Sequence, residues 1–149
     1  MNKKDKKILK NKEILSEIYK NGSSPDPIEL KGIYKITMQT GIIPNLSWLG
    51  HIKTFSHFIS PYNFNVVGCN SFNGWFRWGY FEVQRHYLSV SPFFTVIDYD
   101  LKANWLSRRI KDTIVTIMPK QLYLGKFHYM IFGKPRFLGY FTMERQEIK

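Results

Sequence analysis

Apolar and polar residues alternate along much of the chain after Leu30. Between residues 34 and 39 every second residue is apolar, a period that predicts a half-buried β-strand. Further strands are expected over Ser47–Phe58, Phe64–Phe72, Trp75–Arg85, Phe93–Tyr99, Leu122–Phe132 and Arg136–Arg145. About seven to nine antiparallel strands follow from this pattern. A single antiparallel β-barrel would protect so many strand edges, so the predicted fold class is mainly β.

Two turn sequences suggest hairpins with a defined register. Asn73-Gly74 predicts a two-residue type I′ turn, which would place Asn70 opposite Arg77. Gly133-Lys134-Pro135 predicts a three-residue loop with Phe132 opposite Arg136. An inward row then contains Tyr123, Gly125, Phe127, Tyr129 and Ile131 with Phe137, Gly139, Phe141 and Met143. The other row, with Lys126, His128, Tyr140, Thr142 and Glu144, is expected to face water.

Two segments have the pattern of helices. Residues 1–20 form a basic arm that leads into a short helix, and Asn21-Gly22 ends it. This helix could cap a barrel end, lie on a membrane surface or be partly disordered. A second helix is expected over Ala103–Met118, because Leu106, Ile110, Ile114 and Ile117 are spaced 4, 4 and 3 residues apart. We expect it to pack across one barrel opening. The predicted domains are residues 1–24, the basic arm and short helix, and 25–149, the barrel.

Composition adds three observations. Aromatic residues make up 17% of the chain, which favours pleated surfaces and a ring-lined interior. The net charge of +11 suits binding to polyanions, and it suits solubility equally well. Cys69 is the single cysteine, and the sequence shows neither a secretory signal nor an apolar run of membrane-spanning length. A cytoplasmic protein is therefore expected.

Two short motifs, Trp48–Phe55 and Tyr123-Leu124-Gly125 followed by Gly139–Arg145, resemble the calycin superfamily of lipocalin-like, fatty-acid-binding and nitrobindin-like barrels. The strand phrase Trp48–Phe55 is similar to the Trp-x-Gly strand of small lipocalin-like domains, and Tyr123-Leu124-Gly125 followed by Gly139–Arg145 is similar to their closing strands. The resemblance covers about residues 30–145 in the order of elements. It implies that a small hydrophobic or amphipathic, lipid-like ligand binds inside the barrel without catalysis.

The residues offer few signs of chemistry. Neither a phosphate-binding loop nor metal-ligand spacing occurs, and Cys69 is expected to be an inert thiol. Asp98 and Asp100 are expected to end a strand and cap the following helix. Arg77 either anchors an anionic ligand group beside Asn70 or lies on the surface. The predicted ligand-binding residues are Trp48, Asn70, Arg77, Phe127, Tyr129, Phe137 and Phe141.

Two other functions stay open at this point. Basic charge combined with many rings is typical of modules that bind single-stranded nucleic acid, and the basic arm could bind an anionic membrane surface. A third possibility is haem binding through His128, as in some barrels of the superfamily that the chain resembles.

Overall fold

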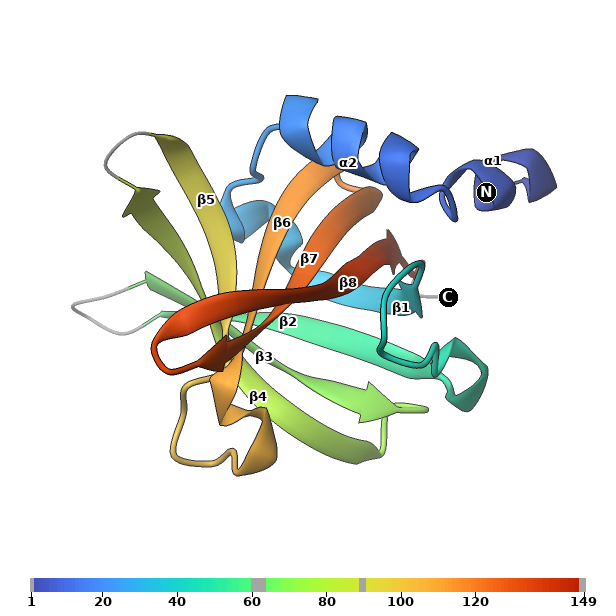
Figure 1. Ribbon diagram of the computed structural model, residues 1–149. Helices are drawn as coiled ribbons and strands as arrows, with labels where there is room; N and C mark the ends of the chain where they lie inside the picture. Colours follow the sequence, from blue (N-terminus) through green and yellow to red (C-terminus); the bar gives the residue numbers. More distant parts are fainter. Residues whose placement is uncertain (1, 60–63, 89–90, 148–149) are drawn as a thin grey trace.

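The computed structural model describes residues 2–59, 64–88 and 91–147. Within these residues, eight antiparallel strands form a closed barrel, which confirms the predicted fold class (Figure 1). The elements are α1 (Lys3–Ile8), α2 (Lys12–Asn21), β1 (Gly32–Met38), β2 (His51–Ile59), β3 (Phe64–Phe72), β4 (Phe76–Leu88), β5 (Ser91–Asp98), β6 (Ile110–Met118), β7 (Leu122–Ile131) and β8 (Lys134–Arg145), with short 3₁₀ helices at Pro27–Leu30, Ser47–Leu49 and Leu106–Arg109.

Each strand pairs with its neighbour in the sequence, and β8 pairs with β1 to close the barrel. Ile36 lies opposite Met143 in this closing ladder. Because direction alternates from strand to strand, the connections β1–β2, β3–β4, β5–β6 and β7–β8 share one end of the barrel, which we call the tip end. We call the opposite end, where β1 begins and β8 stops, the helix end.

Aromatic side chains fill the barrel interior. The buried core consists of Leu30, Tyr34, Ile36, Phe55, Val66, Phe81, Val83, Ile97, Tyr99, Ile114, Tyr123, Phe141 and Met143. Rings contact one another along the barrel. The ring centroids lie 5.8 Å apart in the Tyr34–Tyr123 pair and 5.5 Å apart in the Phe81–Tyr99 pair. Gly125 lies opposite Phe141, whose ring occupies the space that a side chain at Gly125 would need. The interior is therefore a packed core rather than an open cup.

Helix α2 covers the outer face of the barrel wall. Its Leu15 is completely buried and packs with Val115, Leu124 and Tyr140 from β6, β7 and β8 (Figure 1). Nearby, the Tyr19 hydroxyl donates to Thr113 Oγ1 at 2.5 Å. The expectation that this face meets water was wrong for Tyr140 and Thr142, which are buried, whereas Lys126, His128 and Glu144 are half-buried. Of the three roles left open for the helix, the structure supports packing, although on the wall rather than over an opening.

The predicted helix over Ala103–Met118 was wrong. Residues 110–118 form β6, and only Leu106–Arg109 are helical, in one 3₁₀ turn. Asp98 and Asp100 therefore cap no α-helix: Asp98 Oδ2 lies 3.2 Å from Lys111 Nζ, and Asp100 Oδ1 lies 2.6 Å from Arg108 Nε. The apolar spacing misled because β6 is covered on both faces, by the core and by α2.

Both predicted hairpins form, with corrected registers. The β3–β4 turn has three residues rather than two, which places Asn70 opposite Trp78 rather than Arg77, and a bulge beyond this pair places Cys69 opposite Tyr80. The β7–β8 turn has two residues, with Phe132 at φ 50° and Gly133 at φ 73°, as a type I′ turn requires. A bulge at Phe127/His128 then shifts the ladder, so that Tyr123, Phe141 and Met143 are buried as predicted but Phe137 leaves the core and is 42% exposed.

Candidate functional site

Five polar side chains meet inside the barrel near the tip end: His51, Lys53, Asn70, Tyr99 and Asp112. Lys53 Nζ donates to Asn70 Oδ1 at 2.8 Å and lies 3.4 Å from Asp112 Oδ2; it also donates to the Tyr99 hydroxyl. The Tyr99 hydroxyl donates to Asp112 Oδ2 at 3.1 Å. His51 Nε2 lies 3.1 Å from Asn70 Oδ1. We call these five residues the polar cluster.

Three strands and one loop supply the five side chains of the polar cluster, and a fourth strand, β4, supplies a backbone carbonyl. His51 and Lys53 lie in the inward row of β2, and Asn70 of β3 lies beside the bulge at Gly79 of β4, where its Nδ2 donates to the Gly79 carbonyl at 3.1 Å. Asp112 comes from β6, and Tyr99 directly follows β5. The cluster therefore ties together strands that lie far apart in the sequence. Lys53 Nζ also lies 5.0 Å from the centre of the Tyr99 ring, a cation–π distance.

Burial dominates the proton affinities in the polar cluster. It raises the pKa of Asp112 and lowers the pKa of Lys53, and the attraction between the two groups opposes both changes. Burial also raises the pKa of Tyr99, further than the neighbouring hydrogen bond from Asn70 lowers it. The pKa of His51 falls to about 4 because of burial first and the nearby Lys53 second. His51 is therefore neutral at pH 7.

The polar cluster is closed to solvent. Its side chains are between 0% and 8% exposed, and their donors and acceptors are mostly satisfied by one another. Within the described part of the chain, Asp112 Oδ1 and the indole nitrogen of Trp78 are the buried side-chain polar atoms that have no hydrogen-bond partner. Lys, Tyr and His are competent acid–base groups, but a substrate could reach them only if the core opened. We therefore read the polar cluster as a structural device that links strands.

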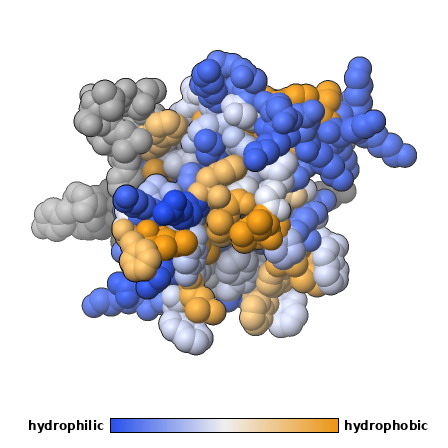
Figure 2. Space-filling view, in the orientation of Figure 1, coloured by the Kyte–Doolittle hydropathy of each residue, from blue (hydrophilic) through white to orange (hydrophobic). Residues whose placement is uncertain are grey.

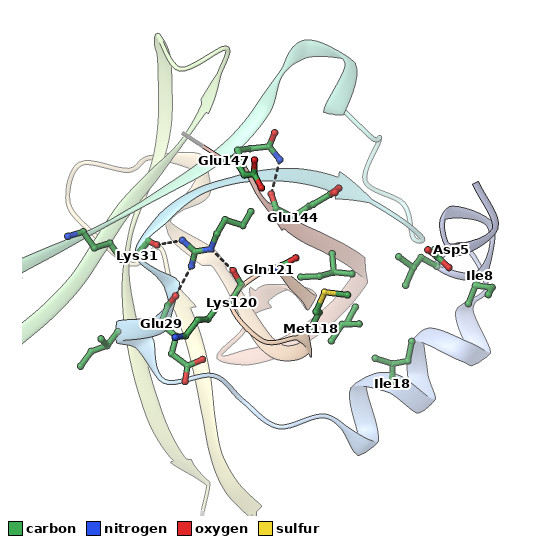
Figure 3. Close-up of a pocket in the computed structure, with 16 residues that line it drawn as sticks. Asp5, Ile8, Ile18, Glu29, Lys31, Met118, Lys120, Gln121, Glu144 and Glu147 are labelled. Atoms are coloured by element: carbon green, nitrogen blue, oxygen red, sulfur yellow. Dashed lines mark hydrogen bonds between the residues drawn. The ribbon is translucent and has the colours of Figure 1, made fainter. Parts of the chain in front are cut away.

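The structure has an accessible space at the other end of the barrel. A cleft of about 1,410 Å³ lies between the N-terminal helices and the barrel rim (Figure 3). We call it the helix cleft. The apolar side chains of its wall are Ile8, Leu9, Ile18, Ile28, Ile117, Met118 and Leu122. Ile8 is 39% and Met118 51% exposed, so part of this wall meets water in the free protein.

Charged and polar groups line the rest of the helix cleft. They are Asp5, Glu29, Lys31, Lys120, Gln121, Glu144, Arg145, Gln146 and Glu147. Arg145 is fixed in place, since its guanidinium donates to the carbonyls of Lys31 at 2.6 Å and Glu29 at 2.9 Å and also to the Tyr34 hydroxyl. Figure 3 shows Lys31, Glu29 and Lys120 on one side of the cleft and Ile8, Ile18 and Met118 on the other. Asp5 lies beside Ile8 on the second side, so the two sides differ in polarity without being wholly charged and wholly apolar.

The predicted ligand-binding residues do not form one site. Asn70 belongs to the polar cluster, Phe141 lies in the core, and Phe127 packs partly buried against that core. Tyr129 is half-buried in β7. The remaining three, Trp48, Arg77 and Phe137, are exposed. Trp48 belongs to a 3₁₀ turn before β2 and not to the strand predicted from Ser47.

The structure also shows the surroundings of His128, considered for haem binding, and of Cys69, expected to be an inert thiol. His128 is half-buried, with its Nδ1 3.3 Å from the Lys111 carbonyl oxygen and its ring 6.1 Å from that of Phe137. Partial burial raises the pKa of the Cys69 thiol, which favours its protonated, unreactive form. Among the described residues, no group of three or more His, Cys, Asp or Glu side chains could hold a metal ion. None of the helices in this part of the chain is long and apolar enough to cross a bilayer.

Comparison of the chain with protein-family models, curated proteins and solved structures finds no match. The geometry alone therefore carries the functional argument. Sequence reasoning missed the helix cleft and four members of the polar cluster. The cleft could have been found only by placing the N-terminal helices against the barrel, because its walls come from residues 5 to 147.

Proposed function

We propose that the helix cleft binds a small amphipathic molecule with an alkyl chain, without catalysis. The observation that carries this proposal is the pairing of an incompletely buried apolar wall with a charged wall in one cleft of about 1,410 Å³. Ligand sites are typically concave and mostly apolar, with a few polar groups that fix orientation. The packed core argues for the cleft rather than the barrel centre as the place of binding.

The charged wall favours a zwitterionic head group. Lys31 and Lys120 stand beside Glu29, Glu144 and Glu147, while Arg145 is occupied by backbone carbonyls. A simple carboxylate would gain from the lysines but be repelled by the acidic groups. A head group that carries both signs can face both. This ligand class agrees with the resemblance to calycin barrels, and we include membership of that group and a cytoplasmic location in the proposal.

A fluorescence titration with a lysophosphatidylcholine that carries an environment-sensitive dye tests the proposal. The full chain should bind the probe, and the double variant Ile8→Lys/Met118→Lys should bind it at least roughly tenfold more weakly, because it places charges on the apolar wall. Both side chains are already partly exposed, so the variant should fold. Ile14→Lys is the matched control, since Ile14 is 37% exposed on α2, close to the 39% of Ile8, and does not line the cleft.

Each outcome is informative. A fatty acid with the same dye should bind more weakly than the lysophosphatidylcholine if the charged wall selects the head group. Equal probe affinity in the wild type and in the Ile8→Lys/Met118→Lys variant would remove the helix cleft from consideration. Absence of binding for both probes would remove the proposed function altogether.

A further inference from the structure

Large apolar side chains protrude from all four connections at the tip end. Trp48 is 77% exposed in the β1–β2 connection, Trp75 78% in the β3–β4 turn, Trp105 86% in the β5–β6 loop, and Phe132 fully exposed in the β7–β8 turn. Ile42 and Leu106 accompany them at 79% and 70%. We call these six residues the tip surface. Large exposed apolar side chains that gather at one end of a molecule mark interaction sites in soluble proteins.

The figures show how these connections are arranged. In Figure 1 the β5–β6 loop and the β3–β4 turn lie at the bottom of the view, with the β7–β8 turn to the left and the β1–β2 connection to the right. Figure 2, in the same orientation, shows orange patches beside pale side chains along the lower edge. The strand order places all of these projections at one end of the barrel, although they lie up to 90 residues apart in the sequence, from 42 to 132.

The charge around the tip surface is strongly positive. The cations in these connections and the adjoining strand ends are Arg77, Lys102, Arg108, Arg109, Lys134 and Arg136, and all of them are exposed. Asp100 is the acidic residue within the same segments (39–50, 73–77, 99–109 and 132–136), and it is paired with Arg108. These segments therefore carry +5, six cations less one anion, of the net +11.

The tip end also contains a second, smaller cavity. It has a volume of about 340 Å³ and is lined by Arg109, Met130, Ile131, Phe132 and Gly133. An apolar recess with a guanidinium at its lining can receive an acyl chain while the cation faces a phosphate. This recess opens beside the exposed Phe132 of the tip surface.

We propose that the tip surface docks on an anionic phospholipid bilayer. Tryptophan favours the membrane–water interface, where its ring is shielded and its N–H stays hydrated, and arginine and lysine favour anionic head groups. The aliphatic side chains of Ile42 and Leu106 decide against single-stranded nucleic acid, which would use stacking rings and a groove. Their natural surroundings are hydrocarbon. This surface lies at the barrel end opposite the helix cleft, so the inference does not depend on the cleft's ligand.

The tryptophans themselves provide the assay. Three of the four, Trp48, Trp75 and Trp105, belong to the tip surface, whereas Trp78 is half-buried. The full chain should sediment with vesicles of phosphatidylcholine and phosphatidylserine, and its tryptophan emission should shift to shorter wavelengths when it binds them. Vesicles of phosphatidylcholine alone should bind it weakly, and high salt should weaken binding to the anionic vesicles. Lipids brominated near the head group should quench the emission.

Two variants separate the tip surface from the rest of the molecule. The double variant Trp75→Ala/Trp105→Ala should lose at least roughly tenfold in vesicle affinity, because it removes two interfacial anchors. Arg109→Glu/Lys134→Glu should bind anionic vesicles comparably more weakly while leaving the three tip tryptophans in place. Ile14→Ala is the matched control, since Ile14 is 37% exposed on α2 and belongs to neither the tip surface nor the lining of the helix cleft, and its vesicle affinity should equal that of the wild type.

Four outcomes would overturn the inference. One is unchanged vesicle binding by the tryptophan double variant, and another is loss of binding only when Lys3, Lys4, Lys6 and Lys7 are changed to Gln. That second result would assign the membrane to the N-terminal arm instead. The third is that the protein binds an oligonucleotide through the tip tryptophans and does not bind vesicles. The fourth is that the wild type is a dimer and the tryptophan double variant is a monomer, which would make the tip surface a contact between two copies of the chain.

Discussion

Replacing His51 should remove much of this protein's sensitivity to mild acid. His51 is 8% exposed, its Nε2 hydrogen-bonds to Asn70 Oδ1, and its pKa is lowered to about 4 from 6.5. Between these two values the unfolded chain binds a proton that the folded chain excludes. Stability should therefore be complete above pH 6.5 and fall as the pH drops toward 4. His51→Gln keeps a side-chain N–H donor but has no titrating group.

The size of the effect follows from the difference in pKa. At about 1.4 kcal/mol per pKa unit, the lowered pKa of His51 corresponds to about 2 kcal/mol of lost stability at pH 5 relative to pH 7.5. Urea unfolding of the wild type and of His51→Gln at both pH values measures it. The wild type should lose about 2 kcal/mol more than the variant. Because other groups titrate alike in both proteins, the comparison isolates the imidazole.

The refuting result is equally plain. If the two proteins lose the same free energy between pH 7.5 and pH 5, the His51 imidazole is not excluded from protonation by the fold. His128 offers an internal comparison, because burial also lowers its pKa but it lies at a different site, against the Lys111 carbonyl. The His128→Gln variant should therefore leave the His51 contribution intact.

Three further predictions concern stability, measured as the free energy of unfolding in urea. Lys53→Met should lower the free energy of unfolding by about 3–5 kcal/mol, because it leaves Asp112 buried without its cation. The double variant Lys53→Met/Asp112→Leu should recover at least half of that loss. If the losses of the two single substitutions simply add, the pairing is contradicted. Leu15→Ala should cost about 2–5 kcal/mol if α2 belongs to the core, and a near-neutral result would make it a separable arm. Gly41→Ala should cost clearly more than Gly133→Ala: both have positive φ, but a Cβ at Gly41 would lie 2.0 Å from the Leu138 carbonyl oxygen, whereas Gly133 has open space.

The strands were predictable because their signal is local. Alternation in residues 34–39 and the Asn73-Gly74 turn identified β1 and the β3–β4 hairpin without knowledge of the rest of the fold. The register was not predictable, since both turns differ in length from the expected ones and each ladder shifts again at a bulge, near Cys69/Asn70 and near Phe127/His128. A bulge inserts one residue and moves every later side chain to the other face.

β6 shows where periodicity fails. Its inward face carries Asp112 and Ile114, while its outward face carries Val115 beneath α2. A strand buried on both sides loses the alternation that would identify it, and the spacing of its isoleucines then imitates a helix. The many β-branched residues over Ile110–Met118 were the contrary signal, because they favour strands.

The polar cluster could not be predicted from local patterns. Lys53 and Asp112 are 59 positions apart, and in isolation each charged residue in a strand indicates a solvent-facing position. Only the barrel's closure brings the two within 3.4 Å inside the core. Asn70 was selected from the sequence as a member of an inward wall, and it does lie inside, but its partners there are His51 and Lys53 rather than Arg77.

The two proposed surfaces lie at opposite ends of the barrel, and this arrangement has a consequence for function. A protein docked through the tip surface would hold the helix cleft away from the bilayer, so an amphiphile in the cleft would not pass to it directly from the docked membrane. The packed core between the ends excludes passage through the barrel. Binding at the cleft and docking at the tips should therefore be independent, with additive free energies, because neither set of variants alters the other surface. A vesicle-dependent change in cleft affinity would require a movement of α1 and α2 relative to the barrel, and the complete burial of Leu15 opposes that movement.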